Sequence, residues 1–170
     1  MRALDAAGID SILPDLPGCN ESTQDFAAQS LHSWRQATAR VAAHFAATEV
    51  LAVRGGALVF PPHLPGHVLE PAKGMAILRQ LLRARTIAAR EMGQRETMDA
   101  LLERGRVEGL ELAGYRCGAA LIAGLEGAVP AIEGQRDIRQ ADLGGGALWL
   151  RAEPGEDPAQ AAALARIVAG

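Results

Sequence analysis

Apolar and polar residues recur along this chain with two periods, and each period predicts a different kind of element. Short apolar runs closely followed by proline or glycine are typical of buried strands, and they cover residues 9–13, 50–53, 67–70 and 147–152. Longer segments with an apolar residue at every third or fourth position predict helices over residues 1–7, 24–48, 75–92 and 158–168. Strands that alternate with helices indicate a parallel sheet with helices on both faces.

Capping residues and prolines between these segments define the expected helix boundaries more closely. Ser22 or Thr23 is expected to cap the helix over residues 24–48. Prolines at 61, 62 and 65 limit any helix after the second strand to about one turn. The pattern then weakens, and it predicts helices over residues 96–104 and 117–126, an extended segment over 110–115 and a polar loop over 131–143. Together these segments predict one α/β domain, residues 1–170, with three layers and a doubly wound, mostly parallel sheet of about four strands.

Composition excludes several functions. Hydrophobic residues make up 49% of the chain but aromatic residues only 4%, so the core must consist mainly of Ala, Leu, Ile and Val. The net charge is −3 and no basic cluster stands clear of acids, which argues against a nucleic-acid partner. No charged leader opens the chain and no apolar run approaches the roughly 18 residues of a membrane span. We therefore expect a cytoplasmic protein without a membrane partner.

Cysteine and histidine show no metal spacing. Cys19 and Cys117 lie far apart and are predicted to be reduced structural thiols, although Cys19 would be a reactive thiolate if an arginine lay beside it. His32 and His44 are twelve residues apart, not at the i, i+4 spacing of a shared metal site. No metal and no cofactor are expected.

The run over residues 50–53 leads directly into a turn that is rich in glycine. In α/β-hydrolases a strand followed by G-x-S-x-G forms the nucleophile elbow, a sharp turn into a helix with the nucleophile at its centre. The aligned residues here are Ala52-Val53-Arg54-Gly55-Gly56. Because a guanidinium stays protonated at any working pH, Arg54 cannot act as a nucleophile. The pentad therefore predicts the backbone of an elbow without its serine.

Other motifs extend this similarity over most of the chain in order and spacing. They are Leu13-Pro14-Asp15-Leu16-Pro17-Gly18-Cys19-Asn20-Glu21-Ser22, Trp34, Gly56-Ala57, Glu70-Pro71, Gly74, Leu78-Arg79, Leu82-Arg83, Ala113-Gly114-Tyr115 and Trp149-Leu150-Arg151-Ala152-Glu153-Pro154-Gly155. With them the chain resembles the exosortase A system-associated hydrolases, α/β-hydrolase-like proteins of bacteria with exopolysaccharide and protein-sorting gene clusters. The resemblance implies a truncated α/β-hydrolase-like fold in which about residues 93–130 form a cap-like insertion.

The chain departs from the hydrolase pattern at each catalytic position. Besides Arg54, Asn20 replaces the second glycine of the D-x-x-G-x-G-x-S loop that follows the fourth hydrolase strand. If residues 9–13 are that fourth strand, the first three strands and the oxyanion loop would lie upstream of Met1. Asp157 falls where the resemblance places the catalytic acid. No histidine follows in the place of the base, since the four histidines are His32, His44, His63 and His67.

Arg54 is the principal candidate for binding. Beside the backbone N–H groups of Gly55 and Gly56, it would hold a small anionic ligand such as a carboxylate or phosphate. Alternatively it pairs with an acid expected at the same edge of the sheet, namely Asp15, Glu153 or Asp157. Glu70 and Glu153 each precede a proline at the end of a predicted strand. These two carboxylates would be suited to acid–base chemistry, or they would pair with arginines.

Two functions remain open from the sequence. The first is a catalytically degenerate hydrolase-like protein associated with exopolysaccharide and exosortase systems. The alternative is a working carboxylic-ester or thioester hydrolase that uses other residues or a partner chain. Either protein is expected to form a homo-oligomer, because a sheet without its outer strands has open edges.

Overall fold

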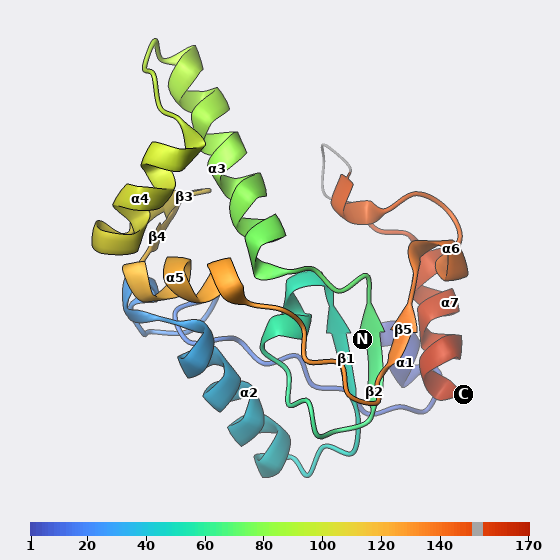
Figure 1. The fold of residues 1–170 in the computed structure, drawn as a ribbon. Coiled ribbons are helices and arrows are strands. Elements are labelled where there is room, and N and C mark those ends of the chain that lie inside the picture. The colour runs from blue at the N-terminus through green and yellow to red at the C-terminus, as the bar shows by residue number, and fades with distance from the viewer. Residues whose placement is uncertain (151–154) are drawn as a thin grey trace.

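The computed structural model describes residues 1–150 and 155–170 and has a mixed α/β architecture (Figure 1). Its larger sheet contains three parallel strands in the order β1-β2-β5. They are β1 (Val50–Val53), β2 (Gly66–Leu69) and β5 (Arg136–Ile138). The strands β3 (Leu110–Leu112) and β4 (Tyr115–Cys117) form a separate antiparallel hairpin. All three parallel strands therefore end at the same edge of their sheet.

The helices divide into two groups in space. Figure 1 shows α3, α4, α5 and the β3–β4 hairpin together on one side of the molecule, and α6 and α7 beside β5 on the other. Within the described residues, no helix combines the length and the apolar character needed to cross a membrane. The bounds are α1 (Arg2–Asp5), α2 (Leu31–His44), α3 (Gly74–Glu91), α4 (Met98–Glu108), α5 (Ala119–Gly127), α6 (Gln140–Leu143) and α7 (Pro158–Ala169), with the 3₁₀ helices η1 (Phe26–Ala28), η2 (Arg54–Leu58) and η3 (Leu148–Leu150).

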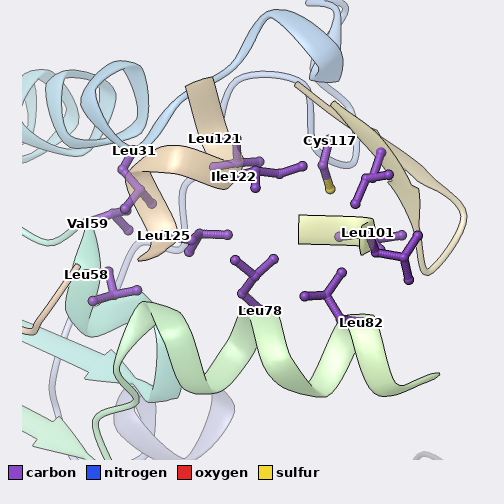
Figure 2. Packing of buried hydrophobic residues seen from close by; sticks show 12 residues of the cluster. Leu31, Leu58, Val59, Leu78, Leu82, Leu101, Cys117, Leu121, Ile122 and Leu125 are labelled. Carbon is purple, nitrogen blue, oxygen red and sulfur yellow. The ribbon is translucent and has the colours of Figure 1, made fainter. Parts of the chain in front are cut away.

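Two hydrophobic clusters stabilise these two regions. The larger cluster joins α2, α3, α4, α5 and the hairpin, and Figure 2 shows Leu78 and Leu82 of α3 facing Ile122 and Leu125 of α5 across its centre. The smaller cluster joins the sheet to the segment that follows β1, through Ala52, Ala57, Phe60 and Val68. Neighbouring residues after β1 alternate between the two, since Leu58 and Val59 belong to the larger cluster. This segment therefore connects both cores.

The strongest periodic patterns gave correct predictions. The strand predicted over residues 50–53 is β1, and the strand predicted over 67–70 is β2, which begins and ends one residue earlier. The two are parallel, with Val50 opposite Gly66 and Val53 opposite Leu69. The helices predicted over 75–92 and 158–168 are α3 and α7. The element after β1 is a single short helix, η2, because the backbone reaches Pro61 and Pro62 three residues after Leu58. The α/β class with a mostly parallel sheet is thus confirmed.

Two predicted strands were wrong. Residues 9–13 form no strand, and Ile12 and Leu13 are exposed. Residues 148–150 form η3 instead of a strand, while residues 151 and 152 lie outside the described part of the chain. In both cases the apolar composition was right for a strand, but no neighbouring strand provides backbone partners. The larger sheet accordingly has three strands in the described residues, and not four.

Three other boundaries also differ from the prediction. The segment 24–48 begins as η1, and the long helix α2 starts only at Leu31, where Ser30 and Ser33 form a capping box. Ser22 instead closes its own loop by accepting from the N–H of Gly18 at 2.9 Å. The polar loop predicted over 131–143 contains β5 and α6, and the extended segment over 110–115 is the start of a hairpin turning at Ala113 and Gly114.

A charged network fastens the connection between α3 and α4. The carboxylate of Glu96 accepts from Arg85 Nε at 2.9 Å and from Arg104 Nη2 at 3.0 Å. Arg85 also donates to the carbonyl of Glu111 in β3 at 2.7 Å. The hydrogen bonds from Arg85, and then those from Arg104, lower the pKa of Glu96 to about 2. The ionised carboxylate of Glu96 therefore joins α3 to α4, and Arg85 joins α3 to the hairpin.

We expect the variant Glu96→Gln to lower the free energy of unfolding by about 1 kcal/mol at pH 7. Because the folded-state pKa lies below the ordinary value of 4.5, this stabilisation is present above that pH. It is lost as the pH falls from 4.5 towards 2. Urea unfolding of wild type and variant at several pH values measures the difference. Glu91→Gln is the control, because Glu91 is exposed and forms no ion pair among the described residues. If the stability difference between wild type and Glu96→Gln did not change with pH, the lowered pKa of Glu96 would be contradicted.

Candidate functional site

The backbone turns sharply at Arg54, between a strand and a short helix. Arg54 is the first residue after β1 and the first of η2, and its φ is +53°, in the left-handed region that side chains other than glycine rarely adopt. Such a residue costs roughly 1–3 kcal/mol and persists only where its surroundings impose it. Here the imposed feature is a turn from β1 directly into η2. The expected strand–turn–helix geometry is therefore present at the expected residue.

The two glycines after Arg54 serve different purposes. A Cβ on Gly55 would lie 2.9 Å from Cδ1 of Ile77 in α3, so a larger residue there would require the end of the Ile77 side chain to move. A Cβ on Gly56 would meet only Ala52, at an ordinary contact distance of 4.0 Å. Of the two glycines, only Gly55 therefore lies in close contact with α3.

The Arg54 side chain is half-buried and lies between a carbonyl and an indole. Its Nη1 donates to the backbone oxygen of Glu70 at 3.3 Å. Its guanidinium carbon lies 4.9 Å from the ring centroid of Trp149, which is a cation–π contact. The carbonyl of Arg54 in turn accepts from the N–H of Ala72 at 3.2 Å. The side chain and the carbonyl of Arg54 are therefore both hydrogen-bonded to residues that directly follow β2.

The Glu70 carboxylate begins a polar network along the carboxyl edge of the sheet. Its Oε1 accepts from the N–H of Gln140 at 2.8 Å, and its Oε2 lies 3.8 Å from Arg139. The Gln140 amide donates to Gln160 Oε1 at 3.0 Å, and the Gln160 amide donates to Asp157 Oδ2 at 2.9 Å. Two glutamines therefore join the predicted acids Glu70 and Asp157.

Asp157 has a structural task at the start of α7. Its Oδ1 accepts from the backbone N–H of Gln160 at 3.1 Å, which is the N-cap interaction, and Pro158 occupies the first helical turn. Gln160 itself is 5% exposed and also donates to the carbonyl of Gly146. Asp157 thus orders the turn that brings α7 against the segment after α6.

The structure does not group all the predicted residues. Asp15 is exposed and accepts from Asn20 Nδ2 at 2.7 Å, inside its own loop. This loop packs against the start of α2, where Trp34 donates its indole N–H to the carbonyl of Pro17 at 2.9 Å. The placement of Asp15 beside Arg54 assumed that residues 9–13 were a strand of the same sheet. Glu153 lies outside the described residues.

Neither cysteine is activated. Burial, followed by the charge of Asp15, raises the pKa of the Cys19 thiol above its usual value. Burial also raises the pKa of Cys117, which belongs to the larger hydrophobic cluster. Both groups therefore remain neutral thiols at neutral pH, contrary to the alternative of a reactive Cys19 thiolate.

The histidines are not arranged as a catalytic base for this edge of the sheet. His67 is the second residue of β2, opposite Leu51, towards the amino ends of the strands. His32, His44 and His63 are exposed, on α2 and on the loop after η2. Among residues 1–150 and 155–170, no group of three or more His, Cys, Asp or Glu side chains gathers closely enough to hold a metal ion.

Three contributors to this site were missed from the sequence. Gln140 and Gln160 connect the acids, and the ring of Trp149 supports Arg54. Gln140 follows β5, a strand of three residues of which Arg136 and Asp137 are exposed. Ile138 is the one buried apolar residue of β5, which is too little to predict a strand from the sequence. Only the capping motif Asp157-Pro158 could have indicated Gln160 from the sequence, because Gln160 lies in the first turn of the helix that this motif begins.

Comparison of the chain with models of known protein families, with curated proteins and with solved structures found no match. The site is therefore defined by its own geometry: a cation in a strained turn, an indole that covers it, and a polar network through Glu70 and Asp157. This arrangement has a fixed positive group and hydrogen-bonding amides, but it provides no activated nucleophile.

The strain at Arg54 predicts that a glycine variant is more stable than an alanine variant, the reverse of the usual order within a helix. Both Arg54→Gly and Arg54→Ala remove the side-chain contacts, but only glycine adopts φ +53° without strain. We expect the glycine variant to be more stable by about 1 kcal/mol in chemical denaturation. Arg79, exposed in the middle of α3, provides the matched control, because there glycine should be less stable than alanine by about 1 kcal/mol. Equal stability of the two variants at position 54 would show that the elbow is not strained.

Proposed function

We propose that this chain is a catalytically degenerate α/β-hydrolase-like protein, a cytoplasmic binding or accessory module of bacterial exopolysaccharide and exosortase systems. The observation that supports it best is Arg54 at φ +53°, directly after β1 and at the first position of η2. α/β-hydrolases carry their nucleophile on a strained strand-to-helix turn, and the position and φ of Arg54 support the proposal by their similarity to it. The proposed lineage rests on this turn and on the sequence motifs that accompany it.

Three features argue for binding over hydrolysis. The side chain at the elbow is a permanent cation, which cannot attack a carbonyl carbon. The acid Asp157 caps α7 and bonds to Gln160, so it does not orient an imidazole. The half-buried His67 lies towards the amino ends of the strands, away from Arg54.

The contacts of Arg54 are compatible with an anionic ligand. Its hydrogen bond to the Glu70 carbonyl is long, at 3.3 Å, and is therefore weak. A carboxylate or phosphate would accept shorter, charge-assisted hydrogen bonds from the remaining guanidinium N–H groups. The indole of Trp149 would keep the guanidinium in place while the ligand binds.

Absence of serine-hydrolase turnover is the expected result of an activity test. The purified protein should not be labelled by a fluorophosphonate probe and should not hydrolyse p-nitrophenyl acetate or a short acyl thioester above the rate of buffer. An active serine hydrolase run in parallel serves as the positive control. Stoichiometric labelling of one serine would instead establish the alternative, a working ester or thioester hydrolase with another nucleophile.

We also propose that the protein self-associates. The strands β1 and β5 form the two edges of the larger sheet, and exposed strand edges favour pairing with another chain. Near the amino end, Ile12 and Leu13 are 52% and 79% exposed in a segment without regular structure. Such residues suit an interface better than open solvent.

Light scattering should accordingly give a mass above that of one chain at micromolar concentration. The double variant Ile12→Asp with Leu13→Asp should lower this mass, and its circular dichroism spectrum should match that of the wild type. Substitution of the exposed Asp5 and Asp10 by Asn is a control for the change of charge in the same region. A monomeric wild type would refute self-association.

A further inference from the structure

A groove of about 580 Å³ lies where the two hydrophobic clusters meet. One wall is α2, another is the end of η2 with the prolines that follow it, and the third is the end of α5 with the chain leading towards β5. Leu58 of the larger cluster and Phe60 of the smaller one both line it. Grooves between two packed units are frequent ligand sites, and this volume lies in the range of small-molecule pockets.

The lining of the groove is apolar and its side chains are mostly small. Alanine or glycine occupies several lining positions on α2, η2 and α5, with Leu58, Phe60 and the prolines completing the surface. Small side chains leave space without offering hydrogen bonds, so the interior of the groove suits hydrocarbon better than a polar molecule. A flexible aliphatic chain fits such a surface.

The groove is lined by one permanent cation, one histidine and no acid. Arg35 of α2 and the exposed His63 line the groove, and none of its lining residues is an acid. Arg35 Nε donates to the carbonyl of Leu58 at 2.8 Å, which fixes the orientation of the guanidinium against the end of η2. Arg35 forms no ion pair among the described residues, so its terminal N–H groups remain available to an anion.

The purely structural interpretation explains only part of this arrangement. Arg35 and Thr38 both donate to carbonyls at the end of η2, those of Leu58 and Val59, and so attach α2 to this segment. One N–H group is enough for the bond from Arg35 to Leu58. Arg35 is exposed, so water solvates its remaining N–H groups, and these groups lie beside an apolar groove that contains no acid.

We propose that this groove binds a single-chain anionic amphiphile, specifically a fatty acid. The carboxylate lies on the terminal N–H groups of Arg35, with His63 as a second donor, and the aliphatic chain lies along Leu58 and Phe60. Apolar burial of the chain supplies most of the affinity, and the guanidinium selects the charged head group. This inference is independent of Arg54 and does not rest on the proposed function.

The test is calorimetric titration of the full chain with dodecanoate below its micellar concentration. Wild type should bind one dodecanoate per chain, and dodecanol, which keeps the chain and lacks the charge, should bind at least about tenfold more weakly. Arg35→Gln should weaken dodecanoate by at least about tenfold, and Arg40→Gln, an exposed arginine of α2 outside the groove, should not. Absence of saturable binding by wild type, or equal loss in the two arginine variants, would overturn the proposal.

A second pair of variants tests the apolar part of the groove and leaves Arg35 in place. Gly127 lines the groove at the end of α5, and a Cβ there would meet nothing within 4 Å, so Gly127→Trp should obstruct the groove while the protein keeps its thermal midpoint. Gly134, which has equal space but does not line the groove, gives the control Gly134→Trp. Dodecanoate binding should be lost in the first variant and retained in the second. Unchanged binding in Gly127→Trp would overturn the proposal.

Two further readouts separate other occupants of the groove. If Arg35→Gln lowers the thermal midpoint, Arg35→Lys provides the comparison. Lysine has a methylene in place of Nε but keeps the positive charge, so it should bind dodecanoate more tightly than the glutamine variant does. Sedimentation with phosphatidylglycerol vesicles, in place of binding to dissolved dodecanoate, would assign the groove to a lipid surface and contradict a free fatty acid. A shift from oligomer to monomer caused by Gly127→Trp would assign it to a second copy of the chain, with the same consequence.

Discussion

The reversal of the backbone at Arg54 is the constraint on which the rest of this structure depends. A parallel strand must leave its sheet at the carboxyl edge and return by a crossover, and here the chain turns within one residue. The turn places Ala57 against the sheet and Leu58 against α3 and α5, so one short helix contributes to both clusters. Without the positive φ at residue 54, η2 would continue in the direction of β1 and the two clusters would lose their common segment.

The part of the fold that sequence predicts well is the part with the most buried periodic residues. Leu78 and Leu82 recur on one face of α3 and are 0% and 2% exposed, so the helical period is unmistakable. β1 is a short, continuous apolar run, and β2 ends in the buried pair Val68 and Leu69. In these elements local preference and burial favour the same conformation.

The errors come from elements that a partner defines. Residues 9–13 and 147–150 have the composition of strands, but a strand exists only where another backbone provides hydrogen bonds. β5 shows the converse, because a single buried residue, Ile138, suffices when β2 lies alongside and Glu70 extends the pairing by donating to its carbonyl. The position of Glu70 in the site was predictable from the shared carboxyl edge of parallel strands. That of Asp15 was not, since it assumed a strand that does not form.

The balance of energies at Arg54 explains how a bulky cation is retained in a strained turn. A left-handed φ costs roughly 1–3 kcal/mol, and glycine would avoid that cost at this position. The contact with the Trp149 ring contributes about 0.5–2 kcal/mol, depending on how far the cation is desolvated, and the long bond to the Glu70 carbonyl contributes less than an ordinary hydrogen bond. These contacts roughly offset the strain but do not exceed it by much. Stability alone therefore gives little reason for arginine in place of glycine, and the proposed anionic ligand would supply the interaction that the folded chain does not.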